Sequence, residues 1–87
     1  MKFNDTIINQ DERYTIGREE TVGGYYVSIP VSNRLVDYDE YYQIDKESYE
    51  LFITNSAQAL EFVKDCRNRC KDELLIFKPG SDRGVAT

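Results

Sequence analysis

The pattern of apolar residues changes at Asp45, and this change constrains the fold more than any other feature of the sequence. Before Asp45, short runs rich in β-branched and aromatic residues are separated by polar or glycine-containing breaks, which is typical of strands. These runs are 6–8, 13–16 and 25–29, and Gly23-Gly24 provides a turn before the last of them. After Asp45, apolar residues recur at helical spacing. Strands followed by helices predict an α+β fold.

Two helices are predicted in the second half of the chain, at about 46–53 and about 57–70. Asp45 is a favourable N-cap for the first helix, and Asn55 or Ser56 can cap the second. The second helix carries an apolar stripe formed by Ala59, Leu60, Phe62, Val63, Cys66 and Cys70. The run 74–77 is short and wholly apolar, which indicates a buried central strand. We therefore expect an antiparallel sheet of about four strands, with both helices packed on one face.

The segment 35–44 admits two interpretations. Val36 and Tyr38, and then Tyr42 and Ile44, alternate with acidic residues as in a half-buried strand, but the alternation does not run through the whole segment. A loop is therefore an alternative to a strand here. The strand and the loop would expose different tyrosines to solvent.

A chain of 87 residues supports one hydrophobic core, so we expect a single domain over residues 1–87, with 78–87 as a polar C-terminal tail. No apolar run approaches the roughly 20 residues that span a bilayer, and residues 1–5 lack the apolar region of a signal peptide. We expect a cytoplasmic protein without a membrane partner. The excess of acidic over basic residues argues against direct nucleic-acid binding, and the absence of histidine excludes histidine-based catalysis.

The two cysteines, Cys66 and Cys70, lie four residues apart and would share one face of a helix. Helical geometry at this spacing is too rigid for an easy disulfide, and a zinc site would need histidine or further cysteines. Reduced cysteines packed as small hydrophobic residues are the favoured interpretation, with a redox or metal-binding role as the alternative. We expect no cofactor and no metal site.

Acidic residues and tyrosines are concentrated between residues 37 and 50. This segment holds six of the 16 acidic residues and one of the 11 basic ones, a net charge of −5, whereas the remaining residues include ten of each. It also holds four of the seven tyrosines. Clustered carboxylates speed the approach of a basic partner, and tyrosines provide large, rigid contact areas. We therefore predict a partner-binding surface formed by Asp37, Tyr38, Asp39, Glu40, Tyr41, Tyr42, Asp45, Glu47 and Glu50.

A purely structural explanation of this segment is also open. In an ordinary edge strand, tyrosines face the core and acids face water, and Asp45 and Glu47 suit a helix N-terminus without any partner. Paired carboxylates can perform acid–base catalysis, but close pairs arise from composition alone in a segment with six acids. We expect no enzymatic activity.

The sequence at residues 37–42 resembles the acidic tyrosine motif of nuclease-colicin immunity proteins. Tyr41 and Tyr42, flanked by Asp37, Asp39 and Glu40, carry this resemblance. That family is all-helical, whereas this chain is predicted to begin with strands. The chain is therefore more similar to the α+β immunity proteins of contact-dependent growth inhibition and other polymorphic toxin systems. The resemblance implies a bacterial protein that neutralises a toxin domain by tight binding.

The leading hypothesis is therefore an immunity protein that binds and inhibits a cognate toxin domain, with a basic nuclease as the expected toxin. An alternative is a nucleic-acid mimic or regulatory adaptor, whose acids would imitate phosphates and occupy a basic protein. Mimicry favours acids spread over an extended surface, whereas here they lie in one segment. A small enzyme using a carboxylate pair is a third hypothesis, and it requires two acids within a cleft.

Overall fold

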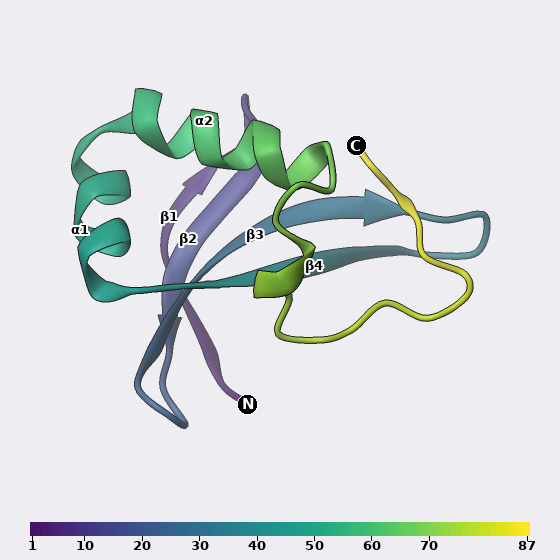
Figure 1. The fold of residues 1–87 in the computed structure, drawn as a ribbon, viewed down its shortest axis with the longest axis horizontal. Helices are drawn as coiled ribbons and strands as arrows, with labels where there is room; N and C mark the ends of the chain where they lie inside the picture. Colours follow the sequence, from purple (N-terminus) through teal and green to yellow (C-terminus); the bar gives the residue numbers. More distant parts are fainter.

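The computed structural model describes all residues from 1 to 87 and shows a twisted antiparallel sheet with two helices on one face (Figure 1). The four long strands lie in the order β1-β2-β3-β4, so each pairs with its neighbour in sequence. In chain order the elements are β1 (Phe3–Asn9), β2 (Tyr14–Glu19), β3 (Gly24–Ser32), β4 (Asp37–Ile44), α1 (Lys46–Thr54), α2 (Ser56–Arg67), a 3-10 turn (Asp72–Leu74) and β5 (Val85–Ala86). The predicted α+β class is confirmed, and of the two interpretations of 35–44 the strand is correct.

Polar side chains hold the three turns between the long strands. Asn33 Oδ1 accepts hydrogen bonds from the backbone N–H groups of Leu35 and Val36, both at 2.8 Å. Asn9 has the same role in the first turn and Glu19 in the second. Such bonds satisfy backbone donors that have no strand partner, which explains why the polar breaks in the sequence become turns.

Glu19 is buried although it carries a charge. Its carboxylate accepts hydrogen bonds from the N–H groups of Lys2, Thr21 and Val22 at 2.9 to 3.0 Å. These bonds, the one from Val22 foremost, lower the pKa of Glu19 to about 2. Because this pKa lies below the ordinary value of 4.5, the carboxylate stabilises the fold above that pH. Its contribution is lost as the pH falls toward about 2.

The hydrophobic core lies between the sheet and the two helices. Its members include Ile16, Val27, Ile29, Val31 and Tyr42 from the sheet, and Phe52, Ala59, Val63 and Cys66 from the helices. Asp45 caps α1 by accepting the Ser48 N–H at 2.8 Å, and Asn55 caps α2 by accepting the Gln58 N–H at 3.2 Å. Neither helix has the length and apolar character needed to cross a bilayer.

The run 74–77 does not form the predicted central strand, and this prediction is wrong. Leu75 forms only an isolated bridge with Tyr42, and the Ile76 N–H donates to the Tyr41 carbonyl at 2.9 Å. The run therefore touches the outer edge of β4 briefly and then leaves it. The physical reason is that β3 has β2 and β4 on its two sides over residues 25–28, so the run 74–77 reaches only the outer edge of β4, and the end of β3 beyond β2 is left for β5.

Helix α2 ends at Arg67, earlier than the predicted 70. Arg69 adopts a left-handed backbone conformation with φ 60°, which ends the helical path. Cys70 consequently leaves the apolar stripe and is exposed, whereas Cys66 is buried in the core, and both thiols are free. Burial raises the pKa of Cys66 to about 12, so it remains a protonated thiol near neutral pH. Packing as a small hydrophobic residue is thus confirmed for Cys66 and wrong for Cys70.

The C-terminal residues 78–87 return to the sheet. The short strand β5 pairs antiparallel with the end of β3, at Val31 and Ser32 (Figure 1). Gly84 lies so close to the Ser32 backbone that any Cβ at this position would clash with it. These residues therefore pack against the same sheet as the rest of the chain.

Candidate functional site

Strand β4 contains most of the residues predicted to bind a partner, and its alternation sends them to opposite faces of the sheet. Tyr42 is fully buried on the inner face, which the helices cover, and Glu40 is 8% exposed on that face. Asp39 and Tyr41 lie on the outer face, which no helix covers. The neighbouring tyrosines Tyr41 and Tyr42 therefore do not form one surface.

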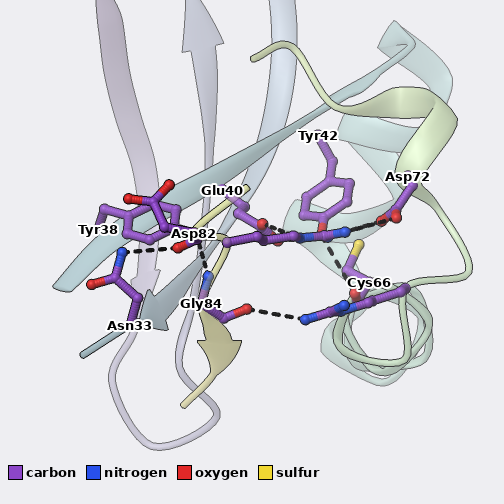
Figure 2. Close-up of polar contacts among 10 residues, drawn as sticks. Asn33, Tyr38, Glu40, Tyr42, Cys66, Asp72, Asp82 and Gly84 are labelled. Carbon is purple, nitrogen blue, oxygen red and sulfur yellow. Dashed lines mark hydrogen bonds and ion pairs between the residues drawn. The ribbon is translucent and has the colours of Figure 1, made fainter. Parts of the chain in front are cut away.

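On the inner face, Glu40 belongs to an ion-pair network that holds the C-terminal residues (Figure 2). The Arg83 guanidinium donates from Nε to Glu40 Oε2 at 2.7 Å and from Nη1 to Asp72 Oδ2 at 2.8 Å. The Tyr42 hydroxyl donates to Glu40 Oε1 at 2.9 Å. The exposed fractions of the Glu40 and Arg83 side chains are only 8% and 12%. The structure thus gives Glu40 and Tyr42 an internal role.

The contacts of this network shift the pKa values of Asp72, Arg83 and Tyr42. Hydrogen bonds from Arg83 lower the pKa of Asp72, and the bonds to Asp72 and Glu40 raise the pKa of Arg83. Burial raises the pKa of Tyr42, and the bond to Glu40 raises it further. Arg83 therefore stays charged and Tyr42 stays neutral near neutral pH. The ion pairs of Arg83 connect β4 to the 3-10 turn and to the C-terminal residues.

Further hydrogen bonds fasten the C-terminal residues beside this network (Figure 2). The Gly84 N–H donates to the Tyr38 hydroxyl at 2.7 Å, and Asn33 Nδ2 donates to the Asp82 carbonyl at 3.0 Å. Arg69 Nη2 donates to the Gly84 carbonyl at 3.1 Å. Tyr38, which is half-buried, therefore anchors the chain end.

The outer face of the sheet gathers four aromatic rings. Phe3 stacks on Tyr41, with ring centroids 4.0 Å apart and an interplanar angle of 20°. The Tyr26 ring lies edge-on to Tyr41 at 5.3 Å, and the Phe77 ring lies edge-on at 6.2 Å. Gly17 makes room for Tyr26, because a Cβ there would clash with the Tyr26 ring. We call this group, together with the carboxylates of Asp5 and Asp39, the outer-face cluster.

The two carboxylates of the outer-face cluster have no basic partner. The hydroxyl of Tyr26 donates to Asp5, but neither Asp5 nor Asp39 forms an ion pair. Asp39 is exposed, but its neighbours remove part of the hydration of its carboxylate, which raises its pKa, and the negative charge of Asp5 raises it further. Burial raises the pKa of Tyr41, and the charges of Asp39 and Asp5 raise it further. The outer face thus combines uncompensated negative charge with aromatic rings.

The other residues predicted to bind a partner lie away from this cluster or at its margin. Asp37 is exposed at the start of β4. Asp45 caps α1, and its bond from Ser48 lowers the pKa of Asp45. Glu47 and Glu50 are exposed on α1, in the helix layer on the other side of the sheet. The structure therefore does not bring Asp45, Glu47 and Glu50 together with Asp39.

Four members of the site, Phe3, Asp5, Tyr26 and Phe77, lie outside the surface predicted from the sequence. Phe3 and Asp5 are two residues apart, which places both on one face of a strand and is the only local signal that could have grouped them. Their approach to Tyr41 depends on the register of β1 on β2 and of β2 on β3, which no local pattern gives.

Neither the side chains of the outer-face cluster nor any known protein points to a particular ligand for it. No three cysteine, aspartate or glutamate side chains lie together in a way that would hold a metal ion. No protein-family model, no curated protein and no solved structure matches this chain. The candidate site is therefore defined by its own residues on the helix-free face of the sheet. It consists of two carboxylates without an ion pair and the partly exposed rings of Phe3, Tyr41 and Phe77, which surround the buried Tyr26.

Proposed function

We propose that this chain is an immunity protein that binds and neutralises a basic bacterial toxin domain, with a nuclease as the expected target. Asp39 and Tyr41 form the centre of the binding surface, Asp5 and Phe77 flank it, and Asp37 lies at its rim. The observation that carries the proposal is the combination of two carboxylates without a counter-charge and partly exposed aromatic rings on a face that no helix covers.

The two components of this surface have separate physical roles. Carboxylates that lack a local counter-charge extend their field into solvent and raise the association rate of a basic protein. Aromatic rings exclude water from the contact and slow dissociation. Together they suit an inhibitor that must capture a toxin quickly and hold it. On the inner face, by contrast, Arg83 neutralises one of the two negative charges of Glu40 and Asp72.

The proposal is tested by co-expressing this chain with a candidate toxin domain encoded next to its gene. We expect the chain to restore growth and the purified proteins to form a complex. The charge reversal Asp39→Lys should slow association by about tenfold at low salt, and the difference should shrink as salt rises from about 0.05 M to about 0.5 M.

The matched control is Glu61→Lys, which makes the same charge change at an exposed position on α2. Its association rate should stay within about twofold of the wild-type rate, because the lysine lies in the helix layer. Equal slowing by both variants would mean that net charge alone matters and would remove the outer face from the interface. Failure to restore growth with a toxin domain that remains active would contradict the immunity function.

A further inference from the structure

A hollow of about 300 Å³ opens between the outer edge of β4 and the returning residues 77–83. Asp39 and Tyr41 line it from the strand, and Phe77 lines it from the returning chain. This volume lies at the small end of the range for ligand pockets, roughly 300 to 1,000 Å³, so it suits one side chain better than a large ligand. The hollow therefore gives the outer-face cluster a specific point of contact.

The backbone of β4 is open at this hollow. Ile76 donates its N–H to the Tyr41 carbonyl, so the odd-numbered residues of β4 direct their backbone polar groups away from β3. Asp39 lies two residues before Tyr41 and has the same orientation, and no further strand pairs with it. Its carbonyl and its carboxylate are therefore both acceptors at the outer edge, next to the hollow.

The aromatic walls favour a flat cation. The Phe77 side chain is 55% exposed, and its ring is nearly perpendicular to that of Tyr41, at 85°. A planar guanidinium can stack on one ring while its N–H groups reach a carboxylate, whereas an ammonium group binds as a point charge. Arginine also pairs with a carboxylate through two parallel hydrogen bonds.

The positive groups already present leave Asp39 without a partner. Arg83 lines the hollow, but its guanidinium is bound to Glu40 and Asp72. Lys78 also lines the hollow, and its charge contributes to lowering the pKa of Asp72. Neither side chain forms an ion pair with Asp39.

We propose that this hollow binds an arginine side chain of the basic partner, with the guanidinium held by Asp39 and packed against the rings of Tyr41 and Phe77. This inference rests on the proposed function for its partner and adds the chemistry by which that partner is recognised. Its test, however, does not need the toxin.

The test is a ¹⁵N NMR titration of the chain with an acetylated tetra-arginine peptide, compared with tetra-lysine and tetra-glutamate peptides. We expect the arginine peptide to shift the amide signals of Asp39, Tyr41 and Phe77. Its affinity should exceed that of the lysine peptide by about two- to fivefold, because a guanidinium stacks flat on a ring and pairs with a carboxylate through two parallel hydrogen bonds, whereas an ammonium does neither. The glutamate peptide should not bind.

Matched variants locate the contact. Asp39→Asn should weaken binding of the arginine peptide by about fivefold or more, and Phe77→Ala by about two- to fivefold. Both side chains are exposed, so both variants should keep the circular dichroism spectrum of the wild type. Glu61→Gln and Val22→Ala make similar changes at exposed positions elsewhere and should leave the affinity unchanged. Lys78→Gln should strengthen binding, because it removes a like charge from the wall of the hollow.

Equal binding of the arginine and lysine peptides, or equal weakening by Asp39→Asn and Glu61→Gln, would overturn this inference. These results are independent of the immunity function. If a toxin complex forms but the arginine peptide does not bind, only the proposed binding of arginine in the hollow is contradicted. Specific arginine binding in a chain that protects against no toxin would contradict the proposed function alone.

Discussion

Two consecutive carboxylates on β4, those of Asp39 and Glu40, have opposite environments. Glu40 faces the helices and is bound by the Arg83 guanidinium and the Tyr42 hydroxyl. Asp39 faces away from the helices, is exposed and forms no ion pair. Its pKa is raised because partial loss of hydration and the nearby charge of Asp5 both disfavour its ionised form. Within one acidic segment, the face of the sheet on which a carboxylate lies therefore decides whether its charge is paired with a cation.

The neighbouring tyrosines repeat this contrast. Tyr42 is fully buried, and its hydroxyl is hydrogen-bonded to Glu40. Tyr41 is only partly buried, and its hydroxyl forms no hydrogen bond within the chain, although its ring packs on Phe3. We therefore expect the inner face to contribute more to stability than the outer face, which is the face proposed for binding, and the following predictions test this difference in stability.

The largest expected effect is the loss of stability in Arg83→Met. The substitution leaves the buried carboxylate of Glu40 without its cation, which typically costs about 3 to 5 kcal/mol. Urea denaturation measures this change in the free energy of unfolding. The double variant Arg83→Met with Glu40→Gln should recover part of the loss, because it removes the unpaired charge.

The control for that prediction is Lys64→Met, which replaces an exposed cation on α2 that forms no ion pair. Its stability should stay within about 0.5 kcal/mol of the wild-type value. If Arg83→Met changed stability as little as Lys64→Met, the inner ion-pair network would not hold the chain end, and the contrast between the two faces would fail.

An intermediate effect is expected when the two adjacent tyrosines each lose a hydroxyl. Tyr42→Phe should lower the free energy of unfolding by about 1 to 2 kcal/mol, because it removes a buried hydrogen bond to Glu40. Tyr41→Phe should change it by less than about 0.5 kcal/mol. The same denaturation experiment compares both variants, and equal losses would show that the two faces contribute alike to stability.

The smallest change in the free energy of unfolding is expected for Asp39→Asn, and this variant should gain stability, whereas Arg83→Met and Tyr42→Phe should lose it. Because the pKa of Asp39 is raised in the folded chain, the folded state favours the protonated form, and stability falls as the pH rises through that pKa. Removing the charge should therefore stabilise the chain at neutral pH, by up to about 0.5 kcal/mol. The gain should disappear well below pH 3.8, the ordinary pKa of aspartate.

The matched variant for this prediction is Asp72→Asn. Arg83 lowers the pKa of Asp72, so that carboxylate stabilises the fold above pH 3.8 and its contribution is lost as the pH falls further. Thermal denaturation across this pH range should thus give opposite signs for the two variants at neutral pH. A loss of stability in Asp39→Asn at neutral pH would mean that Asp39 supports the fold.

Local sequence patterns predicted much of the architecture. The caps Asp45 and Asn55 and the amphipathic spacing after them predicted both helices, because capping and helical period involve residues within a few positions of each other. The run 74–77 was misassigned for the same local reason. A short apolar run is compatible with several environments, and the central positions of the sheet, β2 and β3, are formed by segments earlier in the chain.

The amino-acid sequence by itself determined that residues 37–50 carry the net negative charge and most of the tyrosines. It also determined the alternation that a strand imposes on them. Only the tertiary structure decided which of these charges is neutralised, because Arg83 meets Glu40 across 43 residues of sequence and no cation reaches Asp39. Pairing at that distance depends on strand register and on the return of the chain end to the sheet, and both are properties of the folded molecule as a whole.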